Sequence, residues 1–147
     1  MSDAVTTTSC PTGAAEADQQ RLTEFCPTFA SLMDLLSRRW MGIILRVLMS
    51  GPHRFSEILA AVPGLSDPLL TQRLRELEAS KVLVRRVLAT SPGRVEYELT
   101  ESGRDLEPAL RALSDWAGKW MVPGPGGEPA AVLPAATAER NQARAGA

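Results

Sequence analysis

The chain has 147 residues, of which 44% are hydrophobic and 22% charged, and its formal net charge is −1 at pH 7. This composition is typical of a soluble globular protein with a single domain, and no apolar run approaches the roughly 20 residues that a membrane span requires. Two cysteines are too few for a disulfide scaffold, and one histidine, His53, leaves little scope for acid–base or metal chemistry. We therefore expect a cytoplasmic protein that is not an enzyme and has no catalytic residue, cofactor, metal site or membrane partner.

Composition divides the chain into three parts. Residues 1–20 are rich in Ser, Thr, Ala, Asp and Gln, which predicts a flexible N-terminal tail. Residues 122–147 contain four Pro, four Gly and eight Ala, which predicts a flexible C-terminal tail. The foldable part is therefore expected at residues 21–121.

Charge is uneven within the foldable part. Residues 38–94 contain ten Lys or Arg against four Asp or Glu, whereas residues 95–121 contain three against six. A polyanion would bind the basic middle, and Arg39 and Arg54 of this stretch are candidate DNA-binding residues. The alternative is that these are scattered, solvated charges.

Apolar residues recur at the spacing of an α-helix in four successive stretches. Cys26-Pro27 opens the first helix, because proline suits the first helical position. Ser50-Gly51-Pro52 closes the second, and Ser66 or Asp67 caps the fourth. The four stripes are Phe29, Leu32, Met33 and Leu36; Trp40, Ile43, Ile44, Val47 and Leu48; Phe55, Ile58, Leu59 and Val62; and Leu69, Leu70, Leu74 and Leu77.

The period then changes to that of a β-hairpin. Residues 82–88 are largely β-branched or aliphatic, a Ser-Pro-Gly loop follows, and residues 94–99 alternate polar and apolar side chains. Thr100 then caps a last helix, which is predicted to run unbroken from Glu101 to Met121 with Gly103 as a weak point. Four helices, a hairpin and a helix predict a mainly α chain with a small β-hairpin (α+β), in the order of a winged helix-turn-helix.

The fourth helix is the candidate recognition helix. Only Pro63-Gly64-Leu65 separates it from the third helix, and a short connection containing glycine is typical of a helix-turn-helix. Its leucines would pack inward, and its polar face carries side chains that hydrogen-bond to bases or phosphates. An ordinary surface helix is the alternative. The candidate DNA-binding residues on this helix are Ser66, Thr71, Gln72, Arg73 and Arg75.

The hairpin supplies a second basic element. Arg85 and Arg86 precede its loop and Arg94 follows it. A basic hairpin beside a recognition helix can reach the DNA backbone or the minor groove. Charged residues that protect the edge of a short sheet are the alternative.

The last helix has a broad apolar stripe that includes Leu113, Trp116 and Trp120. On a monomer this stripe would be a large exposed patch, so we expect a homodimer with this helix in the interface, joined by Phe25 and Phe29. Two recognition helices about one DNA turn apart would then read a pseudo-palindrome. The alternative is a long helix that folds back onto its own domain.

Cys26 is a candidate redox-sensing residue. The dipole of the first helix favours a thiolate at this position, and the thiolate is the reactive form. Cys10 in the predicted N-terminal tail could reach Cys26 or another subunit. The alternative is that Cys26 is a small buried apolar residue and Cys10 an incidental thiol.

Three groups of residues form a combined pattern. They are Cys26-Pro27, Leu32…Leu36, Arg39-Trp40, Ile43-Ile44-Leu45 and Gly51-Pro52…Arg54-Phe55-Ser56-Glu57-Ile58; Leu65-Ser66…Leu70-Thr71-Gln72-Arg73-Leu74-Arg75-Glu76-Leu77-Glu78; and Pro92…Arg94-Val95-Glu96-Tyr97-Glu98-Leu99-Thr100-Glu101-Ser102-Gly103. Together they resemble the HxlR-type bacterial transcriptional regulators, which have a MarR-like architecture. The chain departs from the family's common pattern at Ser37-Arg38-Arg39, where Gly-Gly-Lys is usual, and at Asp67-Pro68, where a basic residue is usual.

The resemblance implies a winged-helix homodimer that binds operator DNA, with residues 66–78 as the recognition helix and Arg94 on the wing. It also implies that a cysteine at position 26 is the sensor in members that respond to oxidants or electrophiles. We therefore predict a repressor that binds pseudo-palindromic double-stranded operator DNA and responds to redox change or electrophiles through Cys26. The alternative is a regulator or carrier of small molecules, with an aromatic pocket at the dimer interface formed by Phe29, Trp116 and Trp120.

Overall fold

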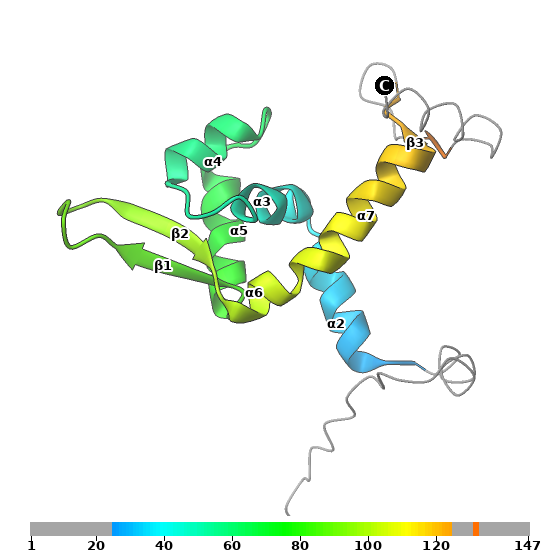
Figure 1. The fold of residues 1–147 in the computed structure, drawn as a ribbon, viewed down its shortest axis with the longest axis horizontal. Helices are drawn as coiled ribbons and strands as arrows, with labels where there is room; N and C mark the ends of the chain where they lie inside the picture. The colour runs from blue at the N-terminus through cyan, green and yellow to red at the C-terminus, as the bar shows by residue number, and fades with distance from the viewer. Residues whose placement is uncertain (1–24, 125–130, 133–147) are drawn as a thin grey trace, which may run out of the picture. The chain divides into compact units, whose positions relative to one another are not determined.

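The computed structural model describes residues 25–124 and 131–132 (Figure 1). The chain divides into two units, one that ends at Ile43 and one that begins at Ile44. Helix α2 (Pro27–Leu36) belongs to the first unit, and helix α3 (Met41–Leu48) continues from the first into the second. The predicted tails fall mostly outside the described residues, and the domain boundaries stay a prediction.

The first unit begins as its sequence indicates. Cys26 is the N-cap of α2 and Pro27 its first residue, and the Cys26 sulfur accepts a hydrogen bond from the backbone N–H of Phe29. In the turn between α2 and α3, Trp40 has a φ of 71°, a left-handed conformation that is uncommon for a residue with a side chain. The guanidinium of Arg39 lies 5.2 Å from the centre of the Trp40 ring. A cation within about 6 Å of an aromatic face is attracted to it.

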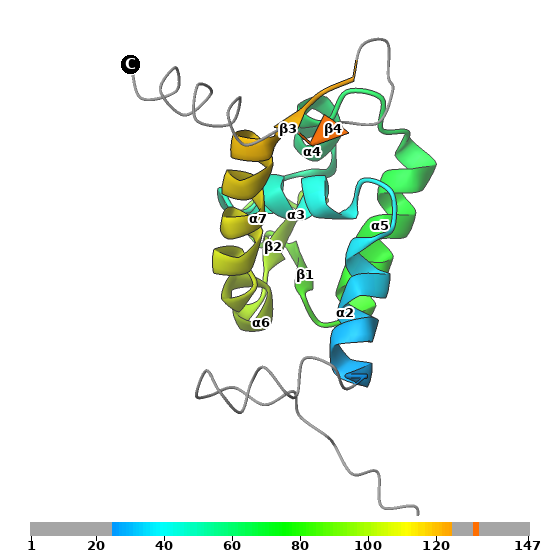
Figure 2. The ribbon, with the colours of Figure 1, turned by 90° about the vertical axis from the view of Figure 1, so that its right-hand side faces the viewer.

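From α3 to β2 the second unit follows the predicted order of elements, whereas its last helix is divided and strands β3 and β4 were not predicted. After α3 come α4 (Phe55–Ala61), α5 (Asp67–Ala79), β1 (Leu83–Val87), β2 (Val95–Leu99), α6 (Glu101–Asp105), α7 (Glu107–Trp120), β3 (Met121–Val122) and β4 (Ala131–Val132). The short strands β3 and β4 pair side by side (Figure 2). This order confirms the prediction of a mainly helical chain with a small β-hairpin.

Aliphatic side chains from almost every element form the core of the second unit. Leu70, Leu74 and Leu77 are buried one helical turn apart on α5, which explains why this helix lies against the core along one face. The other buried hydrophobic residues of this unit are Ile44, Leu45, Leu48, Ile58, Val62, Leu65, Leu83, Leu99 and Leu110.

The hairpin is an antiparallel pair in which Leu83 lies opposite Leu99 and Val87 opposite Val95. His53 adds a bridge to its outer strand. Its backbone N–H donates to the carbonyl oxygen of Tyr97 at 3.0 Å, and its carbonyl oxygen accepts from the N–H of Tyr97 at 2.7 Å. The Nδ1 of its ring donates to the carbonyl oxygen of Gly51 at 2.7 Å. His53 is therefore a turn residue that ties the segment after α3 to the hairpin.

The prediction of one unbroken helix from Glu101 to Met121 is wrong. Helix α6 ends at Asp105, and α7 begins at Glu107 with Pro108 in its first turn. Pro108 has no N–H to donate to the carbonyl oxygen four residues back, and its ring would collide with that carbonyl in a continuous helix. The sequence therefore contained the signal for this break.

Candidate nucleic-acid interface

Helices α4 and α5 form a helix-turn-helix. The connection of residues 62–66 reverses the chain at Gly64, whose φ of 87° is one that glycine adopts without strain. Val62 and Leu65 on either side are buried and anchor the connection to the core. Ser66 then caps α5, because its hydroxyl oxygen accepts a hydrogen bond from the N–H of Leu69 at 3.4 Å. The predicted N-cap and short connection are both present.

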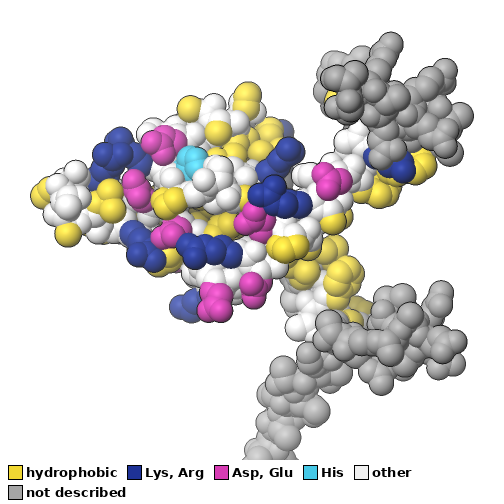
Figure 3. Space-filling view, in the orientation of Figure 1, with side chains coloured by type: hydrophobic (Ala, Val, Ile, Leu, Met, Phe, Trp, Pro, Cys, Tyr) yellow, Lys and Arg dark blue, Asp and Glu magenta, His cyan; other side chains and the backbone are white. Residues whose placement is uncertain are grey.

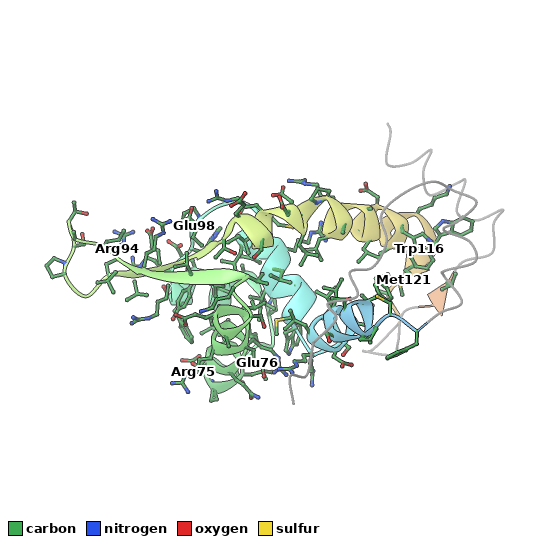
Figure 4. All side chains as sticks on the ribbon, turned by 90° about the horizontal axis from the view of Figure 1, so that it is seen from below. Arg75, Glu76, Arg94, Glu98, Trp116 and Met121 are labelled. Carbon is green, nitrogen blue, oxygen red and sulfur yellow. The ribbon has the colours of Figure 1, made fainter. Side chains whose placement is uncertain are left out.

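Helix α5 presents a polar face on the side away from its leucines. Gln72 and Arg75 are exposed there, and Arg75 extends outward from the helix (Figure 4). Thr71 is half-buried, and its hydroxyl donates to the carbonyl oxygen of Asp67 at 2.9 Å. Within the part of the chain that the structure describes, Arg75 has no ion pair.

Arg73 differs from Arg75 in its surroundings. Its side chain is only 12% exposed, and its Nη1 lies 2.9 Å from Oε2 of Glu76, which is 20% exposed. The same nitrogen donates to Oε1 of Glu76 at 3.2 Å, and Nε2 of Gln72 donates to that oxygen at 3.3 Å. Glu76 thus joins two of the predicted DNA-binding residues. Glu76 was not among the site residues predicted from the sequence, although its position three residues after Arg73 was a signal.

The hairpin also combines bases with acids. Arg86 Nε lies 2.9 Å from Oε2 of Glu98, and Arg104 Nη2 of α6 lies 2.6 Å from Oε1 of the same carboxylate. Arg94 is nearer the tip of the hairpin (Figure 4), and its Nε lies 4.0 Å from Oε1 of Glu96. Arg85 is exposed and, among the residues that the structure describes, has no ion pair. Glu98 is a second functional candidate that the sequence did not reveal, because its partners come from separate elements.

The remaining basic candidates lie apart from α5 in the sequence. Arg54 is exposed and is the N-cap of α4, where its backbone N–H donates to Oε2 of Glu57 at 2.9 Å. Arg39 belongs to the first unit. Basic and acidic side chains alternate over the visible face of the helices and hairpin (Figure 3). The visible face therefore has no uniform positive charge.

Cys26 is disulfide-bonded. Its sulfur also lies 3.5 Å from the hydroxyl oxygen of Thr28. Cys10, the other cysteine of the sequence, lies outside the described residues. Cys26 is half-exposed and takes part in a covalent bond, which does not match the alternative of a small buried apolar residue. Its role as a sensor stays a prediction.

The predicted dimer surface is exposed within each unit. On α7, Leu113 is 57% and Trp116 is 49% exposed, and Lys119 Nζ lies 5.2 Å from the centre of the Trp120 ring. Phe25 and Phe29 are exposed in the first unit. The aromatic pocket that combines residues of both units stays a prediction. In the described part of the chain, no helix is both long and apolar enough to span a membrane.

Comparison with known proteins identifies the architecture. The profile of a family described as HxlR-like helix-turn-helix matches residues 35–124. The chain is 46% identical over 100 residues to YvaP of Bacillus subtilis (strain 168), an uncharacterized HTH-type transcriptional regulator, and the match covers 68% of this chain and 93% of YvaP.

Solved structures agree with this assignment. The reduced form of the transcriptional regulator YodB from B. subtilis is 40% identical with a TM-score of 0.61, and the match covers 69% of this chain and 99% of YodB. The quinone-bound form of YodB is 41% identical with a TM-score of 0.56, covering 63% and 97%. The redox regulator HypR in its reduced form is 36% identical with a TM-score of 0.58, covering 61% and 89%. These relatives confirm the predicted winged helix-turn-helix fold.

Proposed function

Because the chain belongs to the HxlR-like helix-turn-helix family of transcriptional regulators, we propose that it represses transcription by binding pseudo-palindromic operator DNA as a homodimer in the cytoplasm. The observation that carries this proposal is the outward polar face of α5, where Gln72 and Arg75 are exposed. The major groove of B-DNA admits an α-helix, and these side-chain types hydrogen-bond to base edges and phosphates. We assign no catalytic residue, cofactor or metal to it.

The proposed DNA interface has three parts. Helix α5 enters the major groove, and its N-terminus adds a partial positive charge for a phosphate. The hairpin lies along the flanking backbone or minor groove, and Arg54 and Arg39 contact phosphates. Arg73 acts chiefly through Glu76, because its side chain is only 12% exposed. The contacts proposed for α5 and the hairpin are Ser66, Thr71, Gln72, Arg75, Arg85, Arg86 and Arg94.

The proposed homodimer uses α7. Its exposed apolar residues, Leu113 and Trp116, lie on one face of the helix, and burial of apolar surface is the main driving force of association. A two-fold axis beside α7 would relate the two copies of α5 by symmetry. Operator half-sites about one helical turn of DNA apart, roughly 34 Å, would then match the dimer.

The proposed effector is an oxidant or an electrophile that acts on Cys26. The backbone N–H of Phe29, at 3.4 Å from the sulfur, stabilises a thiolate when the disulfide is reduced. Two thiols that form a disulfide lose two protons and two electrons, and these pass to an oxidant such as diamide. The quinone-bound structure of YodB supports an electrophile as a further effector of this chain.

The test of DNA binding is a titration of the full chain, under reducing conditions, with its own upstream DNA over a series of salt concentrations. We expect the affinity for this DNA to exceed that for a scrambled duplex, and to fall steeply with salt because phosphate contacts release counterions. Equal affinity for both duplexes at every salt concentration would contradict operator recognition.

A further inference from the structure

The carboxylate of Glu76 orients the side-chain amide of Gln72. Nε2 of Gln72 donates to Oε1 of Glu76 at 3.3 Å, across one turn of α5. The reverse orientation would bring the amide oxygen against a carboxylate oxygen, so the N–H₂ group is the one that faces Glu76. The amide carries two N–H donors and one acceptor oxygen. One N–H and the oxygen therefore have no partner among the described residues.

Glu76 is itself paired with a cation. Arg73 donates to both of its oxygens, at 2.9 and 3.2 Å, and the two side chains are only 12% and 20% exposed. A carboxylate near a DNA groove would ordinarily repel phosphate. Here the guanidinium of Arg73 offsets that charge, and the carboxylate remains available as an acceptor for Gln72.

The held amide points into the proposed DNA interface. Successive residues of an α-helix are about 100° apart, so Gln72 lies nearly opposite the buried side chains of Leu70 and Leu74. Gln72 is also within the first two turns of α5, the part of a recognition helix that contacts base edges. Its neighbour on the same side is Arg75.

We propose that Gln72 reads an adenine in each operator half-site and that Glu76 is the positioning residue for this contact. The inference rests on the proposed DNA binding. In the major groove adenine presents an acceptor, N7, beside a donor, the N6 amino group, and a glutamine amide pairs with both. Guanine presents two acceptors, N7 and O6. The oxygen of the oriented amide would therefore face an acceptor atom, with no hydrogen between the two. Thymine and cytosine each offer one polar group in the major groove, so each can pair with either the N–H or the oxygen of the amide but not with both.

The experiment begins with the full chain under reducing conditions and a pool of randomised duplexes, from which the preferred site is selected. Each base pair of that site is then changed in turn, and the affinity is measured by fluorescence anisotropy. For the wild-type chain, one A·T pair per half-site is expected at which other pairs weaken binding roughly 5- to 150-fold. Gln72→Ala removes this preference and leaves the preferences at other positions unchanged.

Glu76→Ala tests the positioning. With the amide free to turn, the ratio of affinities for adenine and guanine at this position falls towards one, even where the loss of the negative charge of Glu76 raises affinity for all duplexes. Glu78→Ala, a matched loss of an exposed glutamate on α5, leaves the ratio unchanged. The inference is overturned if Gln72→Ala has the same base preferences as the wild type. It is also overturned if the base pair at which Gln72→Ala loses its preference is G·C. If the wild-type chain selects no preferred sequence from the pool, the proposed function is overturned instead.

Discussion

Gly103 lies directly against the backbone of Val82. A β-carbon at position 103 would overlap the carbonyl oxygen of Val82 and press on the side chain of Leu99 at 3.2 Å. The same carbonyl accepts the N–H of Thr100 at 3.0 Å, and the hydroxyls of Thr100 and Ser102 donate to the neighbouring carbonyl of Lys81. This contact fixes α6 on the segment that leads into β1. Gly103 is thus a packing requirement and not the weak point that its helix propensity suggests.

Gly103→Ala should destabilise the fold. The added methyl group forces the backbone at Val82 to move, and overpacking of this kind costs about 1–3 kcal/mol. Gly118→Ala on α7 is the matched control, because a β-carbon there meets nothing within 4 Å. It should leave stability unchanged or raise it by up to about 1 kcal/mol. Urea unfolding followed by circular dichroism measures both; equal midpoints for the two variants would contradict the packing argument.

Glu98→Gln should release Arg86 for DNA. The ion pairs of Glu98 with Arg86 and Arg104 are largely solvated on the arginine side, at 62% and 60% exposure, so stability should fall by about 1 kcal/mol or less. Affinity for any duplex should rise and depend more steeply on salt. Glu101→Gln makes the same change of charge at an exposed position and should produce a smaller rise. Equal effects would show that Glu98 does not restrain Arg86.

Arg75→Ala should weaken DNA binding without loss of stability, because the side chain extends from α5 into solvent. The expected loss is about 1–3 kcal/mol of binding free energy for a base contact, or a reduction of the salt slope by about 1 for a phosphate contact. Arg111→Ala removes the same charge from α7, where Arg111 pairs with Glu107. Anisotropy titrations at two salt concentrations separate these cases. A loss as large for Arg111→Ala would indicate a general effect of net charge.

Trp116→Glu should dissociate the proposed homodimer, because a carboxylate in an apolar interface is costly to desolvate. Gly118→Glu introduces the same charge on the opposite side of α7 and should leave the dimer intact. Sedimentation equilibrium at micromolar concentration measures the mass of each variant. A wild-type chain that sediments as a monomer would contradict the homodimer itself.

Cys26→Ser should abolish the response of DNA binding to diamide, because the variant cannot form the disulfide in which Cys26 takes part. The affinity of the wild type should change on treatment with diamide and recover with a thiol reductant, whereas the variant should stay constant. Cys10→Ser identifies whether the other cysteine is required. A Cys26→Ser variant that responds as the wild type does would remove Cys26 from the mechanism.

Local signals in the sequence were sufficient to predict helices α2 to α5 and the β1–β2 hairpin. Cys26-Pro27 and Ser66 begin α2 and α5 where predicted, and the change of period after α5 places the hairpin within one or two residues. Such signals act between residues that are close along the chain, so they can be read without a fold. The break at Pro108 was equally local, and its omission was an error of interpretation.

Only the tertiary structure showed which charged side chains are exposed and which are paired across elements. Glu98 joins Arg86 to Arg104 from three different elements, and the two arginines of α5 differ in exposure, because the side chain of Arg73 is only 12% exposed while Arg75 is exposed. In the sequence all four basic side chains carry the same charge and occupy similar polar contexts. Whether a charge is buried, or is paired with a residue of another element, depends on packing between segments distant along the chain, and for that reason it became visible only in the folded protein.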